Sequence, residues 1–280
     1  MTWQVLVRLA SAKKKMLTKE FRYFLLAVGF FTRIPVPQKV DFKEQDLNEA
    51  SKYFPLIGLI VGLIGACVYL LSATFLSLSI AVLFSMLATI YVTGAFHEDG
   101  LADSADGMGG GWNREQILTI MKDSRLGTYG AIALFLALLV KFQLLNALNS
   151  EWIPIALVVG HAISRLAAVW VMATLNYAKQ SGKAKPLATE ISGYSLLLAN
   201  VFGLLPMMFV IILLLMNHYP IVEIAIFLLM TGLPMMLSWF WWQRKVKKWL
   251  EGYTGDILGA MQQITELAFY FGLVLWSVNH

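Results

Sequence analysis

The 280-residue sequence has a single cysteine, Cys67, and few charged residues. One cysteine excludes a disulfide framework, and the absence of C-x-x-C, H-E-x-x-H and GxxxxGK(S/T) patterns excludes the common zinc and P-loop sites. Charged residues make up 14% of the chain and hydrophobic residues 58%, whereas an average soluble domain is about 25% charged. This composition indicates a polytopic membrane protein. In such a protein a net charge of +5 reports orientation rather than nucleic-acid binding, so we expect no nucleic-acid partner.

Seven apolar runs are each close to the ~20 residues that cross a bilayer. They lie at residues 54–75, 78–97, 130–149, 153–174, 194–216, 219–242 and 262–278. The apolar run at 21–31 is too short to span, and two prolines follow it, so we expect an interfacial or re-entrant segment there. The predicted fold is an all-α, polytopic membrane helix bundle. It forms one integral domain over residues 1–280, in which residues 1–52 are an N-terminal cytoplasmic or interfacial segment.

Lysine and arginine gather on one side of this predicted bundle. The connections near residues 76–77, 150–152 and 217–218 contain neither residue, and all but Lys141 and Arg165 of the 22 basic residues fall in segments of the opposite face. Basic loops of membrane proteins stay in the cytoplasm. The pattern therefore places the N-terminus on the cytoplasmic side, together with the polar stretch that follows the second span.

That polar stretch, residues 98–129, is acidic and rich in glycine, and we expect it to be the catalytic segment. If it begins as a helix, Asp99, Asp103 and Asp106 lie at i, i+4 and i+7 on one face, next to Glu98. Like charges at these spacings repel, so a bound cation would stabilise them. Mg²⁺ takes carboxylate oxygens and leaves room for phosphate. The alternative interpretation is a solvated acidic helix N-terminus.

Cations and glycines close to these acids suit a phosphate group. Arg125 can bind phosphate bidentately, which Lys122 cannot; a pair of side chains snorkelling at the membrane edge fits equally well. Arg165 lies inside a predicted span, where a guanidinium costs about 2.5–3.5 kcal/mol or more, so we expect it to face a partner or a cavity. Gly109 and Gly110 would allow backbone N–H groups to approach phosphate oxygens, although a flexible linker has the same composition.

A second glycine-flanked carboxylate, Asp256, precedes the last span, and Glu266 follows ten residues later. On one continuous helix the two would point to about the same side. They suggest a second cation contact or a general base, while helix capping is the alternative for Asp256. The residues alone thus indicate a metal-dependent membrane enzyme of phosphoryl or nucleotidyl transfer.

Several motifs occur in the order in which a known family carries them. They are FTRIPVP at 31–37, YFPLIG at 53–58, HEDGLADSADG at 97–107, KDSRLGTYG at 122–130, Ser164-Arg165 and TGDILGA at 254–260. With them the chain resembles the cobalamin synthase family, the adenosylcobinamide-GDP ribazoletransferases, over residues 31 to 266. The resemblance implies a Mg²⁺-dependent, multi-pass enzyme of the cell inner membrane. Its substrates would be adenosylcobinamide-GDP and α-ribazole (or α-ribazole 5′-phosphate), its products adenosylcobalamin (or the 5′-phosphate) and GMP.

The resemblance also carries residue roles to the matching positions. The implied metal ligands are Asp99, Asp103 and Asp106, with Glu98 as an extra acid. The implied phosphate-binding residues are Arg125 and Lys122, to which the residues alone add Arg165, Gly109 and Gly110. The implied catalytic acids are Asp123, which would orient Arg125 or join the metal shell, and Asp256 and Glu266, one of which would be the base.

Two alternatives stay open at this point. A CDP-alcohol phosphotransferase would match Asp103-Ser-Ala-Asp106-Gly107, but Gly110 and Gly111 occupy the positions of its Ala-Arg pair. A divalent-cation transporter would place its acids deep within spans, whereas these acids cluster at one face and Glu266 is the chief exception. The lipid bilayer is the other expected partner, and the sequence leaves homo-oligomerisation open.

Overall fold

The computed structural model describes residues 19–37, 44–178 and 191–278. Within these ranges the chain is helical and contains no strand, only an isolated bridge between Tyr177 and Tyr253. The prediction of an all-α bundle is confirmed. The basic residues before residue 19, and most of the predicted connection at 175–193, lie outside the described ranges.

Most consecutive helices are joined by short connections. They are α2 (Glu44–Ala50), α3 (Phe54–Ala73), α4 (Leu78–Thr93), α5 (Phe96–Gly110), α6 (Arg114–Met121), α7 (Thr128–Asn146), α8 (Trp152–Thr174), α9 (Gly193–Met216), α10 (Ile221–Leu250) and α11 (Gly255–Ser277). Six helices of the described chain are long and apolar enough to cross a membrane, and α4 with α5 makes a seventh if the bent pair counts as one span. This agrees with the predicted number.

The bend between α4 and α5 was not predicted, because the apolar run 78–97 gives no sign of it. The helix ends at Thr93, where Gly94 and then Ala95 adopt left-handed backbone angles (φ 66° and 59°). Glycine reaches that region without steric cost and often ends helices in this way. The chain turns by 85°. The acidic residues therefore begin a new helix that runs across the bundle instead of continuing the span.

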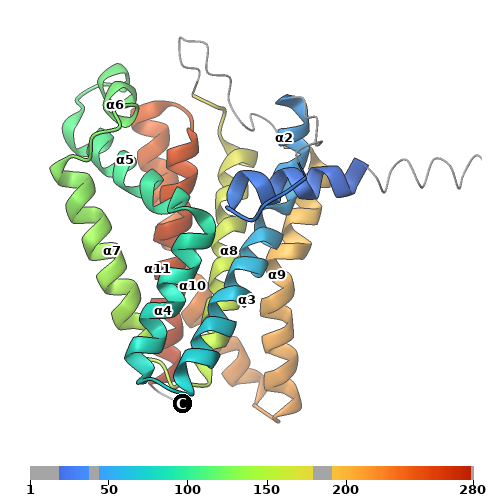
Figure 1. The fold of residues 1–280 in the computed structure, drawn as a ribbon. Helices are drawn as coiled ribbons and strands as arrows, with labels where there is room; N and C mark the ends of the chain where they lie inside the picture. Colours follow the sequence, from blue (N-terminus) through green and yellow to red (C-terminus); the bar gives the residue numbers. More distant parts are fainter. Residues whose placement is uncertain (1–18, 38–43, 179–190, 279–280) are drawn as a thin grey trace, which may run out of the picture.

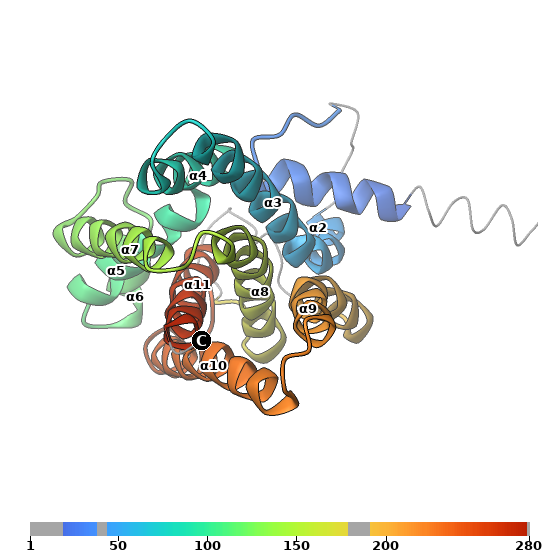
Figure 2. The same ribbon diagram turned by 90° about the horizontal axis from the view of Figure 1, so that it is seen from below.

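Two helices form the centre of the bundle. Figure 2 shows α8 and α11 surrounded by α7, α4, α3, α9 and α10, and most of α8 and α11 is buried, in contrast to α7, α9 and α10. Glycine allows close contact: a β-carbon at Gly62 of α3 would lie 2.6 Å from the carbonyl oxygen of Leu157 in α8. Small residues at such contacts let membrane helices approach closely.

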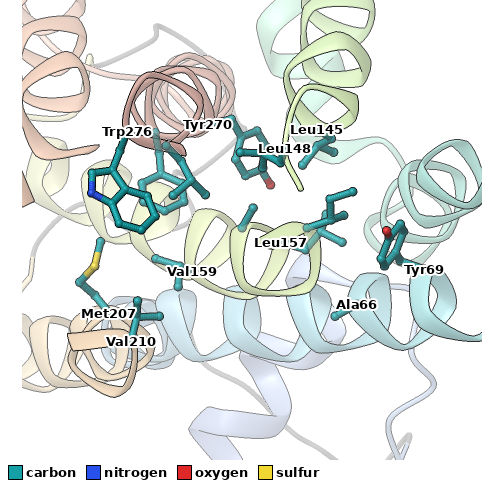
Figure 3. Close-up of a cluster of buried hydrophobic side chains, with 14 of the residues drawn as sticks. Ala66, Tyr69, Leu145, Leu148, Leu157, Val159, Met207, Val210, Tyr270 and Trp276 are labelled. Atoms are coloured by element: carbon teal, nitrogen blue, oxygen red, sulfur yellow. The ribbon is translucent and has the colours of Figure 1, made fainter. Parts of the chain in front are cut away.

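A large apolar cluster fills the half of the bundle away from α6. Side chains of α3, α7, α8, α9 and α11 meet there, among them Ala66, Leu145, Leu157, Met207 and Trp276 (Figure 3). Large apolar side chains also cover the outer faces of α7, α9 and α10. An apolar outer surface of this extent fits contact with lipid. The end of the bundle that carries α6 and α2 is uppermost in Figure 1 and is called the α6 end.

A helix over residues 19–31 lies across the bundle rather than along it (Figure 1). Buried Lys52 anchors it, because its ammonium nitrogen lies 2.9 Å from Glu20 Oε2, which also accepts a hydrogen bond from the Tyr53 hydroxyl at 2.7 Å. The segment is not among the spanning helices, in agreement with the expectation for residues 21–31. Its depth in a membrane stays a prediction.

Candidate active site

The acidic helix α5 is held against α11 by a close crossing of two glycines. A β-carbon at Gly100 would lie 2.8 Å from the carbonyl oxygen of Asp256, and one at Gly259 would lie 3.3 Å from the α-carbon of Gly100. Larger residues at either position would push the helices apart. The contact brings the acidic face of α5 next to the first turn of α11, at the α6 end of the bundle.

Three carboxylates lie near this crossing, and the charge of each acts on at least one other. Residues 99–106 are helical within α5, and Asp103 is half-buried where the negative charges of Asp99, Asp106 and Asp256 act on it. Asp99 is exposed, one helical turn before Asp103, and its charge also acts on Asp256. We call Asp99, Asp103 and Asp256 the carboxylate group. A bound cation would reduce the repulsion between these like charges.

Asp256 is available to this group because another residue caps its helix. The side chain of Thr254 accepts the N–H of Ile257 at the start of α11. Its hydroxyl also lies 3.4 Å from Asp256 Oδ2. The alternative interpretation of Asp256 as the helix cap is therefore wrong. The charge of Asp256 also acts on nearby Tyr177. Burial raises the pKa of the Tyr177 hydroxyl, and the charge of Asp256 raises that pKa further.

Asp106 has a contact that the sequence analysis missed. Its buried carboxylate accepts the N–H of Gly127 at 2.7 Å and the N–H of Gly130 at 2.8 Å, at the start of α7. Any β-carbon at Gly127 or Gly130 would collide with that carboxylate. Asp106 thus caps α7 and fixes the preceding loop to α5. The glycines of the KDSRLGTYG motif were the signal for this contact, because they leave room for an incoming side chain.

The loop 122–127 carries the predicted phosphate-binding cations on its surface. Arg125 is 87% exposed and its Nη2 lies 2.6 Å from Asp123 Oδ2, while its Nε donates to the same carboxylate. The hydrogen bonds and charge of this guanidinium lower the pKa of Asp123. Lys122 is exposed as well. Asp123 orients Arg125, one of the two roles expected for it, but the pair faces outward rather than into the carboxylate group.

Gly109 and Gly110 lie within the last turn of α5. N–H groups inside a helix bond along the helix axis, so these two glycines do not offer the phosphate cradle that we predicted. The structure gives Gly109 a packing role instead. A β-carbon there would lie 2.5 Å from the ring of Tyr129, which packs over that position.

Glu266 is separated from the carboxylate group. Ten residues of helix at ~1.5 Å each put it about 15 Å further along α11 than Asp256. It is buried in the core, where it lies 2.6 Å from the ammonium nitrogen of Lys141 and accepts hydrogen bonds from Tyr270 and Gln262. This position contradicts its predicted role as a base beside Asp256.

Further buried polar groups of α5 and α8 extend this cluster, which we call the core network. Arg165 donates to the carbonyl oxygen of His161 at 2.9 Å, and the His161 ring lies 3.5 Å from Glu266. Gln263 donates to Glu98 at 3.1 Å. Arg165 and Glu98 are therefore core residues, and neither is placed to bind phosphate or metal with the carboxylate group. The cost of burying Arg165 is offset by these partners.

Lys141 is the residue of the core network that sequence reasoning missed. Its sequence signal was present, because Lys141 and Arg165 are the two basic residues that the charge pattern left inside apolar spans. The structure shows that both belong to one network with Glu266 between them. Buried cations in a membrane bundle normally have such partners.

The described residues contain no group of three or more His, Cys, Asp or Glu side chains that could hold a metal ion by themselves. Mg²⁺ rarely needs such a cage, since it keeps several waters and binds one or two carboxylates together with substrate phosphates. Asp99 and Asp103, one turn apart at the open edge of the crossing, fit that mode of binding.

A bundle of long apolar helices with carboxylates from two helices at one end is the architecture of an integral membrane protein with a polar site at that end. A family model described as cobalamin-5-phosphate synthase matches residues 23–274. The chain belongs to this family. The resemblance seen in the motifs is confirmed, and it decides against the two alternatives considered from sequence.

Curated relatives are similar over nearly the whole chain. A protein of Shewanella halifaxensis is 44% identical over 268 residues, which cover 93% of this chain and 98% of the relative. One of Ralstonia pickettii is 46% identical over 253 residues, covering 89% and 94%. Both are named adenosylcobinamide-GDP ribazoletransferase. No solved structure matches the chain.

The capping contact of Asp106 can be separated from metal binding. We expect Asp106→Ala to lower the free energy of unfolding by about 1–2 kcal/mol, as the loss of a helix cap does. The loss should persist in EDTA, because the cap needs no metal. Thermal unfolding in detergent measures it, with Asp99→Ala as the control that removes an exposed acid of the same helix. Equal stability of Asp106→Ala and wild type in EDTA would contradict the capping role.

The core network should show coupling between Lys141 and Glu266. Lys141→Met leaves a buried carboxylate without its ammonium, and we expect a loss of about 3–5 kcal/mol. Adding Glu266→Gln removes that charge and keeps an acceptor for Tyr270, so the double variant should be more stable than Lys141→Met alone. A double-mutant cycle in thermal or denaturant unfolding measures the coupling. Strictly additive losses would show that the two side chains act independently.

Proposed function

We propose that this chain joins adenosylcobinamide-GDP to α-ribazole, or to α-ribazole 5′-phosphate, and releases GMP. The product is adenosylcobalamin or its 5′-phosphate, so the reaction is a last step of cobalamin biosynthesis. Family membership and the names of the relatives support this transferase activity. The observation that carries the proposal is the close crossing of α5 and α11, which brings the charges of Asp99, Asp103 and Asp256 near one another.

The reaction exchanges one bond to phosphorus for another. Because the 5′-phosphate of α-ribazole 5′-phosphate stays in the product, a ribose hydroxyl other than the 5′-hydroxyl attacks the phosphorus that carries cobinamide. The bond from this phosphorus to the bridging oxygen breaks, and GMP leaves with that oxygen. The hydroxyl proton passes to a carboxylate. Asp256 is better placed to take it than Glu266, because it comes from the helix opposite Asp99 and Asp103 and Glu266 is buried in the core network.

Magnesium is part of the proposal. Asp99 and Asp103 would hold it together with oxygens of the substrate diphosphate. A bound Mg²⁺ neutralises charge on the diphosphate. Arg125 is on a neighbouring loop, and the exposed pair that it forms with Asp123 leaves it free to exchange that carboxylate for a phosphate oxygen.

We place the site on the cytoplasmic side of a cell inner membrane, because basic residues gather in the segments of the same face. Ser124, exposed in the loop between α6 and α7, allows a direct test. In a Cys67→Ser background, Ser124→Cys should react with a membrane-impermeant maleimide in inverted inner-membrane vesicles and not in intact spheroplasts. Labelling in intact spheroplasts would place the loop, and the carboxylate group with it, on the outer side.

Turnover by the purified protein tests the activity. Adenosylcobinamide-GDP and α-ribazole with Mg²⁺ should give adenosylcobalamin and GMP, measured by chromatography. We expect Asp103→Asn to reduce kcat by about 10²-fold or more, because the site loses a charge at its centre. Glu115→Gln, an exposed acid of α6, is the matched control and should keep the wild-type rate. Full activity of Asp103→Asn with an intact fold would remove Asp103 from the site.

A further inference from the structure

An apolar cavity lies beside the carboxylate group and has no role in the chemistry described so far. It is enclosed by the helix at residues 19–31, α2, α3 and the starts of α5 and α11. Gly255 and Gly259, which flank Asp256 in the first turns of α11, form part of its wall. Its volume is about 80 Å³, where roughly 10–15 Å³ of such volume holds one water. Space of this size holds several waters, or the inner part of a flat ring.

Aromatic rings make up much of the cavity lining. Phe31 stacks on Phe54 with ring centroids 4.1 Å apart, and Phe30 meets Phe96 edge to face at 5.5 Å. Tyr177 and Tyr253 belong to the same lining, with centroids 5.5 Å apart. A lining of rigid aromatic rings favours a flat aromatic ligand.

The lining offers few polar groups. Hydroxyls of Ser51, Tyr177 and Tyr253 are the side-chain polar groups among the lining residues, and the Ser51 hydroxyl already donates to the carbonyl oxygen of Asn48 at 2.6 Å. A guanine base would bury several donors and acceptors here without partners, and each such group is costly. The benzimidazole of α-ribazole is linked to ribose through one nitrogen and has a single ring acceptor left. The cavity therefore suits this benzimidazole far better than guanine.

Surrounding lipid is a poor occupant of this cavity. None of the large apolar residues that line it belongs to the exposed apolar surface of the bundle, and Phe54 and Tyr253 are almost fully buried. An acyl chain would need an opening through that outer surface. The polar first turn of α11 lies at the cavity instead, next to Asp256.

We infer that this aromatic cavity binds the flat apolar base of the nucleoside substrate and so directs its attacking ribose hydroxyl toward Asp256. The inference rests on the proposed function, because it concerns the acceptor of that reaction. Gly255 lines the cavity and directly precedes Asp256 in α11, and nothing lies within 4 Å of a β-carbon built on it. That space accommodates the ribose, and a side chain at residue 255 would obstruct it.

Gly255→Leu tests the inference without disturbing packing. We expect the KM for α-ribazole to rise about 10- to 100-fold, the effect of losing aromatic stacking on one base, while the KM for adenosylcobinamide-GDP changes less than twofold. Gly193→Leu is the matched control. Gly193 follows the capping Ser192 of α9 as Gly255 follows the capping Thr254 of α11, and space around it is equally open.

Direct binding separates this inference from the proposed function. In EDTA, where no turnover occurs, calorimetry should show α-ribazole binding to wild type and to Gly193→Leu but at least 10-fold more weakly to Gly255→Leu. Binding of this kind by a protein without transferase activity would support the cavity and sink the proposed function. Turnover with unchanged α-ribazole KM and affinity in Gly255→Leu would overturn the cavity alone. Selective loss of GMP binding in that variant would also overturn it, since guanine would then be the occupant.

Discussion

The contact between α5 and α11 at Gly100 and Gly259 is the constraint on which the site depends. It brings carboxylates that are more than 150 positions apart in sequence to one edge of the bundle. The bend at Gly94 makes this contact possible, because it turns α5 away from the axis of α4 and across the first turn of α11. A straight span would carry Asp99 and Asp103 away from Asp256. The bend at Gly94 and the crossing at Gly100 and Gly259 both depend on the absence of a side chain. These two features thus decide where the acidic side chains meet.

The core network holds the same helices together below the crossing. Lys141 of α7, Arg165 of α8 and Glu266 of α11 form a buried ionic cluster, and Gln263 links α11 to Glu98 of α5. Buried ion pairs add little net stability over apolar packing, but the loss of one member strongly destabilises the folded protein. Their geometric demands fix how the helices sit relative to one another. The network therefore fixes the relative positions of the helices that carry the carboxylate group.

The fold could be predicted from apolar run lengths, because a bilayer imposes them, and the i, i+4 spacing of Asp99 and Asp103 predicted their shared face. Which acids stay at the surface could not be predicted. Asp106 turns to the N–H groups of Gly127 and Gly130, and Glu266 turns to Lys141, and both contacts depend on how separate helices pack. Periodicity assigns a side chain to a face of its own helix. It does not say which neighbour that face meets.

The exposed pair of Arg125 and Asp123 has a consequence for selectivity. With a carboxylate at 2.6 Å, the guanidinium presents less net positive charge to other anions than a lone arginine would. A diphosphate offers more negative charge and more acceptor oxygens to replace that carboxylate than the singly charged phosphodiester of a lipid headgroup does. In a protein surrounded by lipid phosphates, the pairing therefore weakens the attraction of this loop to single phosphodiesters more than its attraction to a diphosphate.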